Sequence, residues 1–217
     1  MNDLTTIQQL AVMALPVLFA ITVHEAAHGY VARRLGDTTA MMMGRLTLNP
    51  LKHIDPIGTV LIPVAMFVTT GFLFGWAKPV PVNFRNLHNP RRDMALVAAA
   101  GPGANLLMAI FWVLVTRIGL WIGDASEWVA LPLIYMGGFG LLINAVLMVL
   151  NLLPILPLDG GRVLSALLPP RLSMKFARLE PYGLFIVVGL LVTGLLGKIV
   201  WPGVQAVENL IRALVGL

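Results

Sequence analysis

The 217-residue sequence contains no cysteine and little charge. The absence of cysteine excludes disulfide bonds, cysteine-ligated zinc and thiol catalysis. Any metal ion must therefore be held by histidine and carboxylate side chains, and the chain has four histidines and ten acidic residues. Charged residues make up 12% of the chain and apolar residues 58%. A soluble domain has about 25% charged residues, so this composition excludes a soluble globular protein.

Several apolar runs are long enough to cross, or nearly cross, a membrane. A helix needs about 20 residues to span the ~30 Å hydrocarbon layer. The apolar runs cover residues 10–35, 57–74, 94–122, 131–158 and 181–201. The sequence therefore predicts an all-α polytopic membrane protein, a bundle of about four to six transmembrane helices in contact with the lipid bilayer.

Two segments do not fit a simple spanning helix. Residues 38–56 contain short β-prone pieces separated by Gly44, Asn49-Pro50 and Asp55-Pro56, which predicts a small β-hairpin or sheet. Residues 57–74 are apolar but are interrupted by Pro63 and Gly71. We expect this segment to re-enter the membrane rather than cross it.

The distribution of Lys and Arg supports the re-entrant segment. Basic residues lie on both sides of residues 57–74, and loops rich in Lys and Arg near membrane ends stay in the cytosol. A re-entrant segment keeps both basic loops on the cytosolic side, where the end of the first helix also lies. No basic run alternates with aromatic residues, so the net charge of +5 does not indicate a nucleic-acid partner.

The first apolar run carries a His24-Glu25-Ala26-Ala27-His28 motif. Helix positions i and i+4 share a face, so both imidazoles can bind one metal ion while Glu25 acts on a metal-bound water. The pattern would arise by chance in roughly one such sequence per thousand. The alternative is a polar hydrogen-bond network between helices. Two histidines and a carboxylate in a membrane span are costly to bury without a function, which favours the metal site.

A catalytic zinc ion usually takes three protein ligands and leaves one position for water. Asp159 is the best candidate for the third ligand. It follows an apolar stretch in which Pro154 and Pro157 prevent a regular helix, so its carboxylate can reach sideways into a helix bundle. The alternative for Asp159 is an ordinary turn residue before Gly160-Gly161.

Three motifs in order resemble the site-2 protease family of intramembrane zinc metalloproteases. They are His24-Glu25-x-x-His28, Gly101-Pro102-Gly103-Ala104-Asn105, and Asn151-x-x-Pro154-x-x-Pro157-Leu158-Asp159-Gly160-Gly161. Residues 44–50, 53–59 and 74–80 resemble the compact branch of the family, which lacks PDZ and CBS domains. The resemblance covers residues 20–168. It implies that His24, His28 and Asp159 bind one Zn²⁺ per chain and that Glu25 is the catalytic acid and base.

The resemblance also implies a substrate and a domain organisation. The substrates would be membrane proteins cut in or near a transmembrane segment, with Asn105 and Asn151 as candidate substrate-binding residues. An unwound substrate could add to a strand edge, for which residues 41–48 and 77–83 are candidates. We expect one membrane-embedded protease domain over residues 1–217, with a catalytic core at about 8–168 and C-terminal helices at about 181–217.

Two other functions are compatible with buried ionisable residues. A transporter of metal or small solutes would also use a buried His/Asp cluster, but it leaves Glu25 unexplained. A non-catalytic, zinc-stabilised scaffold has no need of Glu25 either. We therefore expect an intramembrane zinc protease in a prokaryotic plasma membrane, with its active site towards the cytosol.

Overall fold

The computed structural model describes residues 5–61 and 78–216, most of which are helical. The α-helices are α1 (Thr6–Arg34), α2 (Thr39–Met42), α4 (Pro90–Ile122), α5 (Glu127–Asn151), α6 (Asp159–Leu167), α7 (Pro170–Ala177), α8 (Glu180–Val192) and α9 (Leu195–Val215). Short helical turns lie between them: η1 (Pro50–Lys52), η2 (Pro56–Leu61), η3 (Phe84–Asn86) and η4 (Gly123–Ser126).

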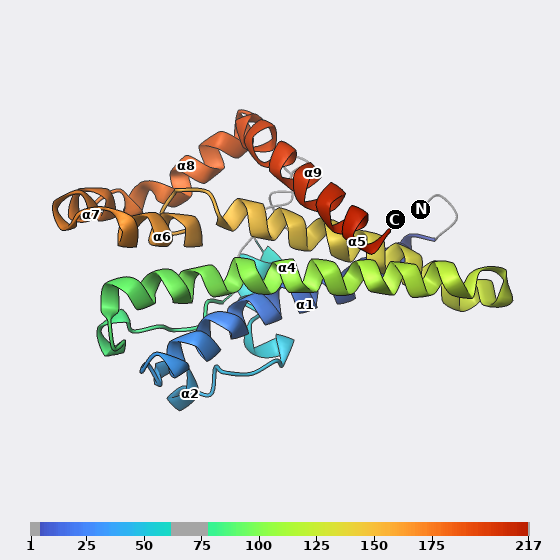
Figure 1. The fold of residues 1–217 in the computed structure, drawn as a ribbon, viewed down its shortest axis with the longest axis horizontal. Helices are drawn as coiled ribbons and strands as arrows, with labels where there is room; N and C mark the ends of the chain where they lie inside the picture. The colour runs from blue at the N-terminus through green and yellow to red at the C-terminus, as the bar shows by residue number, and fades with distance from the viewer. Residues whose placement is uncertain (1–4, 62–77, 217) are drawn as a thin grey trace.

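Helices α1, α4 and α5 pack together at the centre of the molecule (Figure 1). The turn η4 joins α4 to α5, and the two helices pack against each other in antiparallel orientation. Their close approach depends on glycine. A Cβ at Gly137 would overlap Thr116, and one at Gly140 would overlap the ring of Trp112. Small residues of this kind let helices in a membrane pack tightly.

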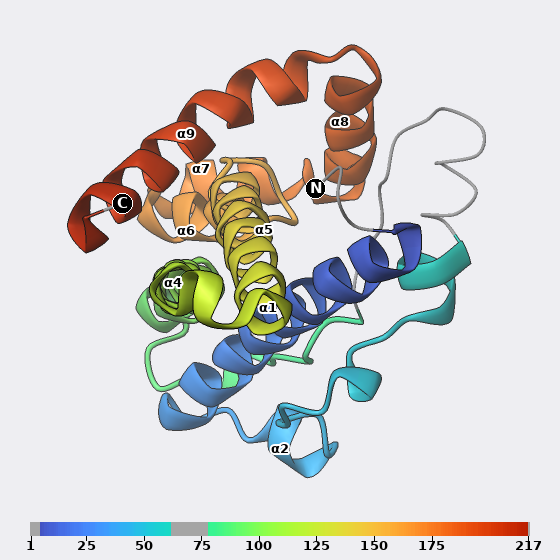
Figure 2. The same ribbon diagram turned by 90° about the vertical axis from the view of Figure 1, so that its right-hand side faces the viewer.

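The remaining helices cover two sides of this centre. Figure 2 shows α8 and α9 on one side of α5, with α1 and α2 on the opposite side. Helix α6 packs against α4, so the segment after α5 returns towards the central helices. This return brings the residues around position 159 back to α1 and α4.

Three described helices are long and apolar enough to cross a membrane: residues 12–34 of α1, α4 and α5. The bent pair α8 and α9 makes a fourth if it is counted as one span. These helices confirm the prediction of a helical membrane protein. The re-entrant segment predicted over residues 57–74 lies largely outside the described residues, and its first five residues belong to η2, a π-helical turn.

The β-hairpin predicted over residues 38–56 is wrong. These residues contain α2, η1 and the start of η2, and no strand. Oδ1 of Asp37 accepts a hydrogen bond from the amide of Thr39 at 3.1 Å, and Oδ1 of Asn49 accepts one from the amide of Leu51 at 3.0 Å. Short polar side chains that bond nearby amides favour turns and helix starts over sheet pairing.

The second expected strand edge is also not a strand over its described residues, 78–83. This segment has no assigned secondary structure, and two of its amides donate to groups outside it. The amide of Lys78 donates to the carbonyl of His53 at 2.9 Å, and the amide of Asn83 donates to Oδ2 of Asp37 at 2.7 Å. Amides that already donate to a loop carbonyl and a carboxylate cannot form a strand ladder.

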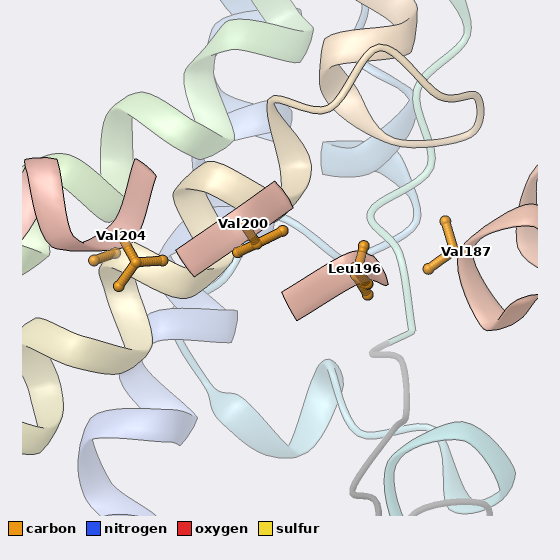
Figure 3. Close-up of a cluster of buried hydrophobic side chains, with 5 residues drawn as sticks. Val187, Leu196, Val200 and Val204 are labelled. Atoms are coloured by element: carbon orange, nitrogen blue, oxygen red, sulfur yellow. The ribbon is translucent and has the colours of Figure 1, made fainter. Parts of the chain in front are cut away.

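The C-terminal span expected over residues 181–201 is two helices instead of one. Helix α8 ends at Val192, α9 begins at Leu195, and their axes differ by 86°. Gly194 between them has φ 71°, a left-handed conformation that ends helices. Both helices bury apolar side chains in a cluster that includes Ala145 of α5. The buried set on α8 and α9 is Val187, Leu196, Val200 and Val204 (Figure 3).

Candidate metal centre

Two histidines one helical turn apart form the part of the site that lies on α1. His24 and His28 lie on one face of α1 and are 8% and 9% exposed. Nδ1 of His24 donates to Oδ1 of Asn105 at 2.5 Å, and Nδ1 of His28 donates to the carbonyl of Val97 at 2.7 Å. Because both acceptors are oxygens, both Nδ1 atoms carry the ring hydrogen. Both Nε2 atoms therefore present lone pairs to the space between the helices.

Asp159 brings a carboxylate to these lone pairs from another part of the chain. Helix α5 ends at Asn151, and a non-helical connection that contains Pro154 and Pro157 leads to Asp159, the first residue of α6. Oδ2 of Asp159 lies 3.3 Å from Nε2 of His24 and 3.4 Å from Nε2 of His28. The structure therefore brings together the three residues that the sequence predicts as metal ligands.

Glycine at position 101 forms the wall of the site on α4. A Cβ there would lie 2.5 Å from Cε1 of His24 and 2.5 Å from Nε2 of His28. The backbone of α4 thus lies directly against both imidazoles, and a larger residue has no room. Gly160 has a comparable position beside Asp159, because a Cβ there would overlap the carbonyl of Leu152.

The donor set fits a zinc ion. Ligands about 2.0–2.2 Å from a tetrahedral zinc ion lie about 3.3–3.6 Å from one another. The two Nε2 atoms are 3.1 Å apart, and both lie 3.3–3.4 Å from Oδ2 of Asp159. This Oδ2 is buried and has no hydrogen-bond partner. The two Nε2 lone pairs and the carboxylate oxygen point at one another with no hydrogen atom between them. Such a group of electron-pair donors is typical of a cation-binding site.

Glu25 lies between the two histidines in sequence and is partly buried. Its Oε2 accepts a hydrogen bond of 2.7 Å from the amide of Val80. The residues before Val80 are held in turn by Arg45, whose Nη2 donates to the carbonyls of Lys78 and Pro79 at 2.9 and 3.3 Å. The loop after α1 and the segment before α4 together fix the position of the Glu25 carboxylate.

The two asparagines predicted to bind substrate occupy different environments. Asn105 on α4 is fully buried and bonds to His24, as described above. Asn151, the last residue of α5, donates from Nδ2 to the carbonyl of Leu147 at 2.9 Å and is partly exposed. Substrate binding by these two residues stays a prediction.

Three contacts of the site have no signal in the sequence motifs. They are the carbonyl of Val97 at His28, the amide of Val80 at Glu25, and the side chain of Asn144 at Asn105. The first two are backbone groups, which any residue supplies. Asn144 is a polar residue in an apolar helix, but its sequence neighbourhood gives no indication of its partner.

The chain is similar along most of its length to proteins that are named as zinc metalloproteases. Residues 117–194 match peptidase family M50. The chain is 39% identical over 204 residues to "Putative zinc metalloprotease YwhC" of Bacillus subtilis, a match that covers 93% of this chain and 90% of that protein. It is 32% identical over 184 residues to "Putative zinc metalloprotease Rip2" of Mycolicibacterium smegmatis, covering 83% and 66%. No solved structure gives a significant match.

These relationships decide between the functions that the sequence left open. Both relatives are named as zinc metalloproteases, and nothing among the matches supports a transporter. The apolar helices place the buried His/Asp group in a membrane protein, and the group has the donors that zinc prefers. The chain therefore belongs to peptidase family M50, the site-2 protease family, and is an intramembrane zinc metalloprotease.

Proposed function

We propose that His24, His28 and Asp159 hold the zinc ion of this metalloprotease and that Glu25 is its general base and acid. The observation that carries the proposal is the convergence of two Nε2 lone pairs and one carboxylate oxygen at separations of 3.1–3.4 Å. Among the residues that the structure describes, these three are the group of His, Asp and Glu side chains arranged to bind a metal ion.

The chemistry follows from these assignments. A zinc ion held by these residues would polarise the scissile carbonyl and lower the pKa of a nearby water molecule. Glu25 would take the proton of the attacking water and later deliver it to the nitrogen of the leaving amine. The Val80 amide holds Oε2 of Glu25, so we assign the proton transfer to Oε1. The near-complete burial of His24 and His28 limits access of bulk water to the site.

We propose that the substrates are transmembrane segments of other proteins, cut after local unwinding. The site-2 protease family cleaves membrane proteins within the bilayer. A helical amide is inaccessible while it is hydrogen-bonded within its own helix, so the substrate must unwind before Glu25 and the metal can act on it. Asn151 lies at the end of α5 and at the start of the connection to Asp159, where a substrate backbone could bond to its side chain.

We further propose that residues 1–217 form one membrane-embedded domain in a prokaryotic plasma membrane, with the site towards the cytosol. Arg33 and Arg34 occupy the last turn of α1, and Arg91 and Arg92 lie in the first turn of α4. The absence of cysteine allows a clean test with single-cysteine variants. A thiol at the exposed Met174 position should react with a membrane-impermeant maleimide only from the cytosolic side, and a thiol at the Trp128 position only from the other side.

The catalytic assignment is tested with purified protein in detergent. Glu25→Gln should bind zinc at the wild-type stoichiometry but cleave single-span membrane peptides about 10²–10⁴-fold more slowly, because the proton acceptor is lost. His24→Ala should lose both zinc and activity. Glu127→Gln, which changes the exposed carboxylate of the first residue of α5, serves as the matched control and should retain both. Wild-type cleavage by Glu25→Gln would refute the role of Glu25.

A further inference from the structure

A chain of buried side chains connects α5 to the metal centre. Asn105 on α4 and Asn144 on α5 are both 0% exposed. Nδ2 of Asn144 donates to the carbonyl of Gly140 at 2.8 Å, and Nδ2 of Asn105 donates to Oδ1 of Asn144 at 2.9 Å. Oδ1 of Asn105 then accepts the hydrogen bond from Nδ1 of His24 at 2.5 Å. Three helices therefore meet in one uninterrupted series of hydrogen bonds.

The series has only one consistent direction. The carbonyl of Gly140 can only accept, so Asn144 must turn its NH₂ group towards it and its oxygen towards Asn105. That oxygen can also only accept, so Asn105 must turn its NH₂ group towards Asn144 and its own oxygen towards His24. His24 must then carry its hydrogen on Nδ1, which leaves the lone pair on Nε2 facing Asp159.

We propose that Asn144, acting through Asn105, is a positioning residue that fixes the Nδ1–H tautomer of His24 for zinc binding. The inference rests on the proposed role of His24 as a zinc ligand. Partners that orient a ligating histidine typically change metal affinity by about 10–100-fold. Helix α5 thus contributes to the metal centre although it supplies none of the three proposed ligands.

The two histidines are oriented by different means. His28 donates to a backbone carbonyl, that of Val97, and this acceptor persists in any side-chain variant. His24 depends on two side chains, because its acceptor is the oxygen of Asn105, and the amide nitrogen of Asn105 donates to Asn144. The Asn105 amide has a second acceptor, the carbonyl of Ala20 at 3.4 Å, which is a longer contact than the 2.9 Å to Asn144.

The test measures zinc affinity by competition with a chelating dye, using metal-depleted protein in detergent. Asn105→Leu removes the acceptor of His24 and should weaken zinc binding about 10–100-fold. Asn144→Leu should weaken it about tenfold, because the Asn105 amide is no longer held in one orientation. Asn105→Asp keeps an oxygen acceptor at His24 and should recover most of the affinity lost in Asn105→Leu, although it cannot donate to Asn144.

A second readout reports the tautomer directly. In ¹⁵N-histidine spectra of the metal-depleted protein, the Nδ1 resonance of His24 should indicate a protonated nitrogen in the wild type and a mixture of tautomers in Asn144→Leu. Thr116→Val is the matched control, because it removes another buried polar group between α4 and α5. It should change neither the zinc affinity nor the His24 resonance. If Asn144→Leu does not fold, Asn144→Ala and the two Asn105 variants still decide the outcome.

Three outcomes would overturn the relay, and they are distinguishable. If His24→Ala loses zinc but the folded Asn105→Leu and Asn144→Leu proteins bind zinc within twofold of the wild type, the relay is refuted and His24 remains a ligand. If His24→Ala itself retains zinc at wild-type affinity, the proposed ligand assignment fails and the relay fails with it. Equal zinc losses in Thr116→Val and Asn144→Leu would show a packing effect and would also overturn the relay.

Discussion

Gly101 shows how a single residue determines the space for the metal centre. Its α-carbon faces both imidazoles, and even a methyl group there would lie 2.5 Å from each ring. Gly103, two residues further along α4, has no neighbouring atom within 4 Å of the corresponding position. The two glycines of the Gly101-Pro102-Gly103 motif therefore have different surroundings, and only the first is required by packing against the histidines.

We expect Gly101→Ala to displace the histidines and Gly103→Ala to be tolerated. Overpacking of a buried site costs about 1–3 kcal/mol, so the melting temperature of Gly101→Ala should fall and its zinc affinity should decrease. Gly103→Ala should be neutral or stabilise the helix by up to about 1 kcal/mol. Thermal unfolding and zinc titration of the two purified variants check this. Equal behaviour of both variants would contradict the role assigned to Gly101.

The sequence predicted which residues form the site better than it predicted the contacts that those residues make. The spacing of His24 and His28 is enough to place both on one helix face, and two prolines are enough to free Asp159 from a regular helix. Asn144 could not be predicted, because its partner Asn105 lies 39 positions away and only the packing of α4 against α5 joins them. The ligand and substrate roles themselves stay predictions.

At the scale of elements, the loop after α1 is organised by a carboxylate instead of a sheet. Asp37 is buried and accepts hydrogen bonds from the hydroxyl of Thr39, the amide of Asn83 and Nδ2 of Asn86. The short β-prone pieces separated by turn residues predict a hairpin here. This pattern does not show that one buried carboxylate accepts hydrogen bonds from amides that a strand ladder would use. The error arose because Asp37 and its partner Asn83 are distant in sequence.

The bonds to Asp37 predict an acid-sensitive loop. Burial raises the pKa of the Asp37 carboxyl, but the bonds from Thr39, Asn83 and Asn86 outweigh burial and the pKa is lowered overall. A carboxyl whose pKa is lowered by folding stabilises the fold at pH values above its pKa in the unfolded chain, about 3.9. This stabilisation is lost as the pH falls through the pKa of the folded state.

Wild-type protein should therefore lose stability as the pH falls below about 4. Asp37→Asn should lack this component and should be less stable by about 1–3 kcal/mol at neutral pH, because its NH₂ group meets donors. Melting temperatures of both proteins between pH 7 and 3, with Glu127→Gln as a control for an exposed carboxylate, provide the measurement. The same pH dependence in Asp37→Asn and wild type would rule out Asp37 as its source.

A second prediction at this scale concerns the position of Glu25. Arg45 bonds the carbonyls of Lys78 and Pro79 and so holds the amide of Val80 at Oε2 of Glu25. Arg45→Ala should lower kcat about tenfold and leave the zinc content unchanged. A misplacement of a catalytic group by about 1 Å can cost up to about 10²-fold in rate, so a tenfold loss corresponds to a smaller displacement of Glu25. Arg85→Ala, an exposed arginine of the same loop region, is the control. A loss of zinc in Arg45→Ala would point to general unfolding instead.

At the scale of the whole molecule, the C-terminal helices support the loop that carries Asp159. The buried cluster of α8 and α9 is anchored on Ala145 of α5. At the start of α8, a Cβ on Gly183 would overlap the carbonyl oxygen of Leu156, three residues before Asp159. Apolarity alone predicted helices in this region, but neither the bend at Gly194 nor the contact with the Asp159 loop follows from hydropathy.

From this contact we expect the metal centre to be sensitive to changes in α8. Gly183→Ala should force the 156–158 connection away from α8, move the Asp159 carboxylate relative to His24 and His28, and reduce zinc affinity. Gly189→Ala, on the same helix but with nothing within 4 Å of the new methyl group, should bind zinc as the wild type does. Zinc titration of the two variants compares them directly. If Gly183→Ala bound zinc normally, the C-terminal helices would be packing partners of α5 without influence on the metal centre.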